Sequence, residues 1–207
     1  RTVRAACLPG GDSALQWAMS LFPGVVADPD VLATSLSNVN LVLHPPGALL
    51  AAAWTEATGG DYRFYVDAMT PAVARVLTGL DAERRAVAKV LGHELPSLLD
   101  EMARVGTVDP QAAERADVVA AIRGGEANKA IKGPDSIEHR YYREDIPYGL
   151  LPFTVLAGIA GVPVETADAL LKLGCVAAGL DPVTGLDRVR LGLEDCGLDE
   201  LIAMVRA

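Results

Sequence analysis

Runs of alanine, leucine and valine recur along the chain without the alternation of apolar and polar residues that marks a strand. Proline or glycine interrupts these runs, as at Pro45-Pro46, Gly59-Gly60 and Gly161-Val162-Pro163. Proline is tolerated in the first turn of a helix and glycine commonly ends one, so the pattern predicts a series of packed helices. With 51% hydrophobic residues and a mean hydropathy of +0.27, the chain can bury one substantial core. The predicted fold class is mainly α.

The segment RTVRAACL at positions 1–8 alternates and then becomes apolar before the turn Pro9-Gly10-Gly11-Asp12, which predicts one short strand. A single strand makes no sheet, so we expect its partners upstream of this sequence, or else an extended arm. Helices are expected over 12–22, 45–57, 71 onward, 95–105, 110–124, 151–160 and 165–180, with a loop over 23–29, a mixed segment over 31–43, a solvated stretch at 83–85 and a long polar connection over 125–145.

The charge balance excludes some partners. The formal net charge is -9 and the pI is about 4.8, whereas binding to phosphates needs clustered lysine and arginine. The longest apolar run, over 149–164, is broken by proline and glycine and is shorter than the roughly 20 residues of a membrane span. We therefore expect no nucleic acid and no membrane, which leaves small molecules or proteins.

The three cysteines, Cys7, Cys175 and Cys196, are odd in number and widely spaced. This usage fits a reducing compartment, and we expect a cytoplasmic protein with small buried thiols. The sequence shows no pair of histidines with zinc spacing, no nucleophile elbow and no phosphate loop, so no metal site is expected. No G-x-G-x-x-G follows a strand, and the chain should not cradle a dinucleotide in the usual way.

Two places in the sequence concentrate chemistry. His44 ends the apolar run LVLH, follows Asn38 and Asn40, and precedes two prolines. It is either an acid/base group or a structural histidine hydrogen-bonded at a helix entrance. The segment HRYYREDIPYG over 139–149 is either a solvated charged loop or a site in which an arginine binds a carboxylate and an acid orients a histidine.

Four segments, taken together, carry a resemblance to a known family. They are TSLSNVNLVLHPPGALL (34–50), FYVDAMTPAVARVLTGLDAERRAVAKVLG (64–92), IKGPDSIEHRYYREDIPYGLLP (131–152) and AGVPVETADALLKL (160–173). In order and spacing the chain resembles the octopine/nopaline (opine) dehydrogenase family from about Leu8 onward. The most specific elements are N-x-x-x-H-P and R-Y-x-x-E-D-x-P-Y-G.

The resemblance implies an all-helical domain, like the C-terminal domain of 6-phosphogluconate dehydrogenase, that follows a Rossmann domain. Residues 1–11 would then be the last strand and linker of an absent nucleotide-binding domain, and residues 12–207 the helical substrate domain. That missing Rossmann domain, in cis or in trans, is the expected partner, and an alanine-rich helical face could also form a homodimer.

The resemblance also implies an activity. Family members reduce the imine formed between an amino acid and a 2-oxo acid such as pyruvate, using NADH or NADPH. By resemblance, His44 is the acid/base group, Asp145 its carboxylate partner and Arg140 the holder of the oxo acid's carboxylate. Asn40 and Tyr148 are candidates for binding substrate, and Asn38 for the nicotinamide.

Two alternatives stay open. The chain could be a helical binding or dimerisation module without catalysis, although it retains His44, Asp145 and Arg140. It could also belong to a related dehydrogenase that acts on a different hydroxy or oxo acid, which only analysis of the product would separate from the first reading.

Overall fold

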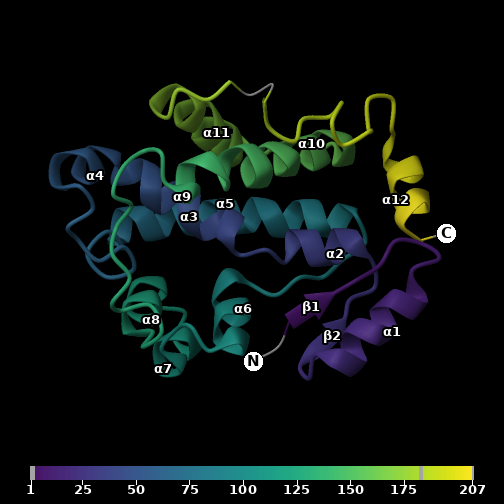
Figure 1. Ribbon diagram of the computed structural model, residues 1–207, viewed down its shortest axis with the longest axis horizontal. Coiled ribbons are helices and arrows are strands. Elements are labelled where there is room, and N and C mark those ends of the chain that lie inside the picture. The colour runs from purple at the N-terminus through teal and green to yellow at the C-terminus, as the bar shows by residue number, and fades with distance from the viewer. Residues whose placement is uncertain (1–2, 182–183, 207) are drawn as a thin grey trace.

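A computed structural model describes residues 3–181 and 184–206, which are mostly helical (Figure 1). The elements are β1 (Val3–Ala5), α1 (Asp12–Leu21), β2 (Val25–Ala27), α2 (Val31–Leu36), α3 (Asn40–Leu50), α4 (Ala52–Thr58), α5 (Pro71–Val90), α6 (Leu98–Val105), α7 (Pro110–Glu114), α8 (Val118–Gly124), α9 (Arg140–Arg143), the π-helix η1 (Ile146–Leu150), α10 (Leu151–Ala160), α11 (Glu165–Ala177) and α12 (Leu198–Arg206). The mainly α prediction is confirmed.

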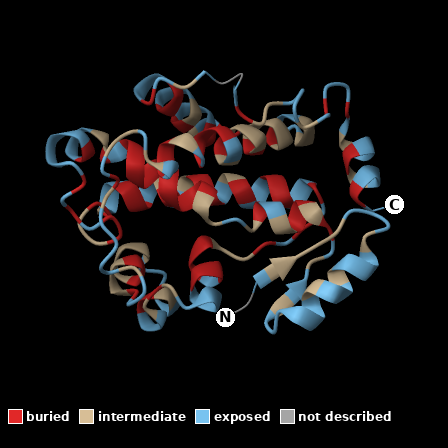
Figure 2. Cartoon of the chain, viewed as in Figure 1, coloured by how far each residue is buried: buried red, intermediate tan, exposed pale blue. Residues whose placement is uncertain are grey.

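Helix α5 is the central element of the core. The side chain of Thr70 accepts a hydrogen bond from the backbone N–H of Val73, and Pro71 occupies the first turn, so the helix begins where the sequence predicts. It contacts α3, α10 and α11, and the buried residues gather along these helices in Figure 2. Its fully buried side chains include Leu77, Leu80 and Val87. No helix within the described ranges combines the length and the apolar character that a membrane span requires.

The first strand has a partner inside the chain. Strand β1 pairs in parallel with β2, and Val3 lies opposite Val25 while Ala5 lies opposite Ala27. The expected loop over 23–29 is therefore wrong in its centre, because two adjacent β-branched valines extend there beside β1. Helix α1 connects the two strands, and together they form a strand-helix-strand unit at one corner of the molecule (Figure 1).

Helix α3 begins earlier than predicted. The sequence predicts a start at Pro45 or Pro46, but the helix begins at Asn40 and holds both prolines in its interior. Each proline lacks an N–H group and so leaves a carbonyl one turn earlier without its usual helical donor. Every residue from Leu41 to Leu49 is buried, and we attribute the survival of the helix to this apolar packing, which outweighs the lost hydrogen bonds.

The predicted helix over 110–124 is two helices. Between α7 and α8, Ala116 adopts a positive φ of 56°, which breaks the helical path. Asp109 and Asp117 each accept a hydrogen bond from a backbone N–H group in the first turn of the helix that follows. Each helix therefore has its own N-cap residue. The prediction of a single long helix did not take the N-cap at Asp117 into account.

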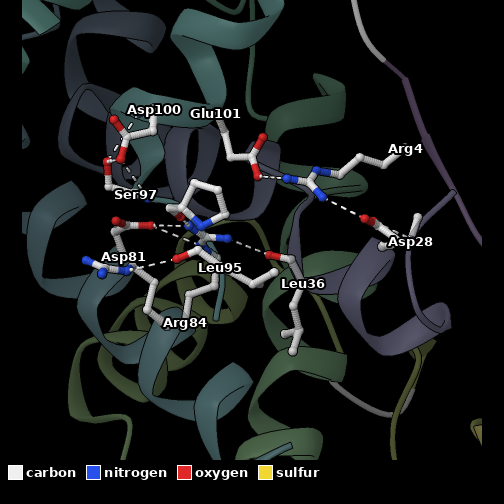
Figure 3. A network of polar contacts seen from close by, with 12 residues as sticks. Arg4, Asp28, Leu36, Asp81, Arg84, Leu95, Ser97, Asp100 and Glu101 are labelled. Atoms are coloured by element: carbon white, nitrogen blue, oxygen red, sulfur yellow. Dashed lines mark hydrogen bonds and ion pairs between the residues drawn. The ribbon is translucent and has the colours of Figure 1, made fainter. Parts of the chain in front are cut away.

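Arg84 is not solvated as the sequence indicated, because its side chain is fully buried. Its guanidinium donates to Asp81 Oδ1 from Nε at 2.9 Å and from Nη2 at 2.7 Å. It also donates to the carbonyl of Leu36 at 2.8 Å and to that of Pro96 at 2.7 Å. Asp81 in turn accepts from the backbone N–H of Leu98 at 3.0 Å. The network in Figure 3 thus ties α5 to the end of α2 and the start of α6.

A second arginine in Figure 3 joins the strand unit to the helices. Arg4, in β1, donates to Asp28 Oδ1 and to Glu101 Oε1, each at 2.6 Å. Asp28 directly follows β2, and Glu101 lies in α6. Helix α1, by contrast, has no buried residue. Ion pairs therefore carry part of the attachment of this unit to the helical body.

His93 is also buried, although its place between Gly92 and Glu94 in a polar stretch is typical of a surface residue. Its Nε2 lies 2.9 Å from Asp30 Oδ1, and the Nε of Arg206 donates to Asp30 Oδ2 at 2.8 Å. Asp30 caps α2 as well, accepting from the backbone N–H groups of Leu32 and Ala33. The cluster holds the C-terminal helix α12 to the start of α2 and the end of α5, which no local pattern in the sequence shows.

Asp30 makes the stability of the fold depend on pH. Burial acts to raise the pKa of Asp30, but hydrogen bonds from Arg206 and Ala33 and the charge of His93 outweigh it and hold that pKa below the ordinary value of 3.8. Its stabilising contribution is therefore complete above pH 3.8 and is lost as the pH falls through the lowered value in the folded state. In Asp30→Asn the capping group remains but the charge is gone, and we expect the unfolding free energy at pH 7 to fall by about 1.5–3 kcal/mol.

The measurement is urea unfolding of both proteins from pH 7 down to about pH 1, a range that includes the lowered pKa of Asp30. Stability should decline more steeply with acid in the wild type than in Asp30→Asn, so that the two curves converge at low pH. Asp199→Asn, at an exposed position in α12, serves as the control and should run parallel to the wild type. Parallel curves for Asp30→Asn would contradict the expected role of the carboxylate charge.

Candidate active site

His44 lies at the centre of a buried polar cluster. Its Nδ1 is 2.8 Å from Asp145 Oδ2, although the two residues are 101 positions apart, and its Nε2 is 2.9 Å from the Tyr65 hydroxyl. A carboxylate only accepts, so Nδ1 carries the proton that it donates to Asp145. Nε2 of the neutral ring then accepts from the Tyr65 O–H. His44 and Tyr65 are each only 5% exposed, and both ring nitrogens are engaged within the protein.

Aromatic rings fix the plane of the imidazole. Tyr141 stacks on His44 with ring centroids 3.9 Å apart and an interplanar angle of 23°, and Phe64 meets it edge-on at 6.1 Å. The phenyl ring of Phe64 lies directly over Gly47, where an added Cβ would come within 2.7 Å of it. A glycine one turn after His44 is therefore required for Phe64 to reach this place. Tyr141 thus covers one face of the imidazole, and the side chain of His44 is only 7% exposed.

Asp145 reaches the cluster from a tight irregular turn. It follows the short helix α9, and its backbone N–H donates to the carbonyl of Arg140 at 3.3 Å. Its own carbonyl accepts from the N–H of Leu150 at 3.0 Å, five residues on, which is the spacing of the π-helix η1. Single π-turns are frequent at functional sites because they reposition a side chain within a helical path. Here the turn directs the carboxylate toward α3.

The electrostatics of the cluster keep its phenol neutral. Burial raises the pKa of Tyr65 far above its ordinary value of 10.0, and the Tyr141 hydroxyl and the charge of Asp145 act in the same direction, while Arg140 opposes them. The nearby His139 has its pKa lowered, mainly by partial burial and also by the positive charge of Arg140, although the charge of Asp135 opposes them. Its ring packs edge-on against Tyr141, with centroids 4.5 Å apart.

Arg140 lies beside the cluster, at its exposed side. Its side chain is 57% exposed and its Nε lies 3.5 Å from Glu144 Oε2. It is near enough to act on the pKa values of both Tyr65 and His139. An exposed guanidinium at the edge of the buried His44–Asp145 pair has the geometry to form two hydrogen bonds with an incoming carboxylate.

The other predicted site residues lie apart from His44. The side chain of Asn38 accepts from the backbone N–H of Asn40, and the Tyr148 hydroxyl donates to the carbonyl of Thr184 at 3.5 Å. Asn38 and Tyr148 both line a cavity of about 520 Å³ whose other walls are mostly leucines. Within residues 3–181 and 184–206, no hydrogen bond joins Asn38, Asn40 or Tyr148 to the His44 cluster. The same part of the chain holds no group of three residues that could ligate a metal ion.

The sequence did not single out Tyr65 or Phe64 as members of the site. They belong to a short aromatic segment, DYRFYV, 21 residues after His44 in the case of Tyr65. Nothing local indicates which of these rings turns inward. Gly47 is consistent with this arrangement, because only a residue without a Cβ leaves room for the ring of Phe64.

Comparisons with known proteins agree with this architecture. The family model described as NAD/NADP octopine/nopaline dehydrogenase, alpha-helical domain, matches residues 27–178. An opine dehydrogenase from Arthrobacter sp. (strain 1C) is 35% identical over 96% of the chain and 53% of its own length, and a vitopine synthase from Allorhizobium ampelinum is 28% identical over 69% and 38%. The chain thus spans about half the length, or less, of the curated relatives that it matches.

Solved structures of an octopine dehydrogenase share the fold. A complex with NADH and L-arginine superimposes with a TM-score of 0.67 at 22% identity, and one with NADH and pyruvate with 0.63 at 24%, each over 92% of the chain and about half of the other protein. The fold is therefore that of the helical domain of a dehydrogenase. More specifically, the chain belongs to the octopine/nopaline dehydrogenase family, of which it contains the alpha-helical domain.

Proposed function

We propose that the chain is the substrate-binding and acid/base half of an NAD(P)H-dependent opine dehydrogenase, which joins an amino acid to a 2-oxo acid. The observation that carries the proposal is the buried pair of His44 and Asp145, with its 2.8 Å hydrogen bond, beside the exposed guanidinium of Arg140. A condensation that forms and dehydrates a carbinolamine needs a group that takes up and returns protons, and a 2-oxo acid needs an anion clamp.

Each residue has one task in the proposed reaction. Arg140 binds the carboxylate of the oxo acid and so orients its carbonyl. His44 accepts at Nε2 the proton that the amino group loses on attacking that carbonyl, and returns a proton to the oxygen that leaves as water. Asp145 keeps Nδ1 protonated and stabilises the imidazolium while it carries the positive charge. NAD(P)H supplies the hydride that reduces the imine. Asn40 and Tyr148 stay candidates for substrate contacts, outside the central pair.

The described residues do not form a main binding site for the dinucleotide. Helix α1 follows strand β1, as in a nucleotide-binding unit, but its first turn carries Asp12, whose charge would repel a pyrophosphate. We propose that a Rossmann domain outside this chain binds NAD(P)H, with Asn38 as a contact to the nicotinamide. Residues 1–11 would be its last strand and linker, and the pairing of β1 with β2 supports moving that boundary past Ala27.

The surface of the strand unit supports such a partner. Trp17, Leu21 and Phe22, in and just after α1, are 63–68% exposed. Neighbouring exposed aromatic and aliphatic side chains mark an interaction surface more often than a solvent-facing one. A homodimer is a second possible use of the exposed apolar residues, among them Val176 on α11. We also propose a cytoplasmic location, which the free thiols of Cys7, Cys175 and Cys196 support.

The test of the function uses the chain joined to a nucleotide-binding domain of the family. NAD(P)H oxidation is followed with mixed amino acids and pyruvate, and the product is identified by mass spectrometry. A secondary amine that contains both substrates supports the proposal. A hydroxy acid formed without the amino acid would instead identify a related dehydrogenase, and the absence of turnover would favour a binding module.

Arg140→Met tests the anion clamp. The change removes the charge-assisted hydrogen bonds to the oxo acid, each worth about 1.5–3 kcal/mol, so KM for pyruvate should rise roughly tenfold to a hundredfold while KM for the amino acid changes little. Arg143→Met, which removes an arginine of the same helix that pairs with Glu138, is the matched control. Equal effects of the two substitutions on KM for pyruvate would exclude Arg140 as the specific clamp.

A further inference from the structure

The proposed reaction requires His44 to exchange protons with the substrate, although its side chain is buried. Both nitrogens of His44 are hydrogen-bonded inside the protein, and stacked or edge-on rings cover the imidazole. A buried acid/base group can exchange protons with a substrate only through an atom that bonds to it. On the Nδ1 side that atom belongs to Asp145, whose carboxylate fixes the tautomer. On the Nε2 side it is the hydroxyl of Tyr65, at 2.9 Å.

We propose that the Tyr65 hydroxyl is a catalytic relay through which His44 exchanges its proton with the substrate. The inference rests on the proposed function and adds a residue to its proton path. A hydroxyl is suited to this place because it can accept from Nε2–H and donate its own proton at the same time. A carboxylate or an amide could not do both with one atom.

Position and charge support the direction of the relay. The Tyr65 hydroxyl lies 2.9 Å from Nε2 of His44 and within electrostatic reach of Arg140, whose charge acts on its pKa. Arg140 is the exposed group expected to hold the oxo acid. Burial raises the pKa of the phenol and keeps it neutral, so it transfers a proton without accumulating charge. The proposed path therefore leads from His44 through Tyr65 to a substrate held by Arg140.

The proposed step balances. In the dehydration of the carbinolamine, the C–O bond breaks and its oxygen takes the proton of Tyr65, leaving as water. Tyr65 takes the Nε2 proton of the imidazolium, so that His44 becomes neutral and Tyr65 is unchanged. The nitrogen lone pair of the substrate forms the C=N bond of the protonated imine. No oxidant or reductant takes part. The substrate enters as an ammonium ion, which gives one proton to His44 and a second to the carbonyl oxygen as the carbinolamine forms. The proton held by His44 then returns through Tyr65, so the oxygen leaves with two protons as water.

Tyr65→Phe removes the relay and keeps the ring. In the chain labelled with ¹⁵N-histidine, the His44 Nε2 resonance should move toward that of an imidazole nitrogen without a hydrogen bond. In the joined enzyme, kcat should fall roughly tenfold to a hundredfold with little change in either KM, since water replaces a hydroxyl only in part. Tyr142→Phe is the matched control, because that buried hydroxyl donates to the carbonyl of Ala48 and does not contact His44. It should leave both readouts unchanged.

A measurement on the wild type tests the relay even if Tyr65→Phe does not fold. With kcat measured in mixtures of H₂O and D₂O, two protons in motion give a curved dependence on the deuterium fraction, whereas one gives a straight line. A straight line, an unchanged kcat in Tyr65→Phe, or a lost kcat with an unmoved Nε2 resonance would each overturn the relay. A wild-type joined enzyme without turnover would instead refute the proposed function, and the relay with it.

Discussion

Replacing His44 with glutamine is expected to lower kcat of the joined enzyme by about 10²–10⁴-fold, the usual contribution of a positioned acid/base group. Glutamine can still hydrogen-bond to Asp145 or Tyr65, but it neither takes up nor releases a proton near neutral pH. Binding of NAD(P)H, measured by fluorescence titration, should be unaffected, because His44 is not among the residues proposed to contact the dinucleotide. Circular dichroism and thermal unfolding show whether the buried substitution leaves the helices intact.

Asp145→Asn separates the two members of the pair. An asparagine can donate to Nδ1 and thereby favour the tautomer with its proton on Nε2, as well as removing the charge that stabilises the imidazolium. We therefore expect kcat to fall here as well, with His44 still present. If His44→Gln retained a wild-type kcat in a folded protein, the assignment of acid/base chemistry to this pair would be wrong.

Arg84→Met is expected to have the largest effect on stability. Removing one partner of a buried ion pair typically costs about 3–5 kcal/mol, because the remaining charge has no compensation. Here the substitution leaves Asp81 without its pair and the carbonyls of Leu36 and Pro96 without their donor. Urea unfolding monitored by circular dichroism measures the loss of unfolding free energy directly.

The controls for Arg84 follow from the same network. Arg75→Met, at an exposed position of α5, should change the unfolding free energy by no more than about 0.5 kcal/mol. The double variant Asp81→Leu/Arg84→Met removes both charges, and it should recover part of the loss, since an apolar pair needs no desolvation of ions. A loss below about 1 kcal/mol for Arg84→Met alone would contradict a structural role for the buried guanidinium.

Local signals in the sequence were sufficient for much of the helical framework. Thr70 and Pro71 mark the start of α5, and Gly161 marks the end of α10, because capping and proline effects act within one turn. The same reasoning was wrong for α3. There the prolines argued for a start at position 45, whereas burial of the whole helix decided otherwise. Tertiary packing overrides local propensity when almost every side chain of a helix faces the core.

The prediction for some charged residues was also wrong, because tertiary contacts decide whether they are buried. Glu83, Arg84 and Arg85 form a run that is typical of a solvated face, yet Arg84 is fully buried and Glu83 accepts from the backbone N–H groups of Thr166 and Ala167 at the start of α11. His93 is buried against Asp30 in the same way. Arg84 has one local partner, Asp81, three residues earlier on α5. Its carbonyl acceptors, the N–H groups that donate to Glu83, and Asp30 beside His93 all lie outside α5, so no local pattern indicates their burial.

The resemblance to the family was needed to name His44, Asp145 and Arg140 together, since spacing alone left both the histidine and the arginine segment open to structural readings. The hydrogen bond between His44 and Asp145 is present in the fold, and their catalytic role stays a prediction. No local signal in the sequence indicates that Tyr65 belongs to the site. Its ring packs against Phe64, which lies over Gly47 of another element.

Arg4 makes two ion pairs that join the strand unit to the helices. Because its guanidinium binds Asp28 and Glu101 at the same time, the strand pair is held to α6. A sheet extended from these strands would be joined to α6 through the same two ion pairs. The three side chains are at most 23% exposed, so salt screens these pairs less than it screens pairs on the surface, and the attachment of the strand unit should persist at high ionic strength.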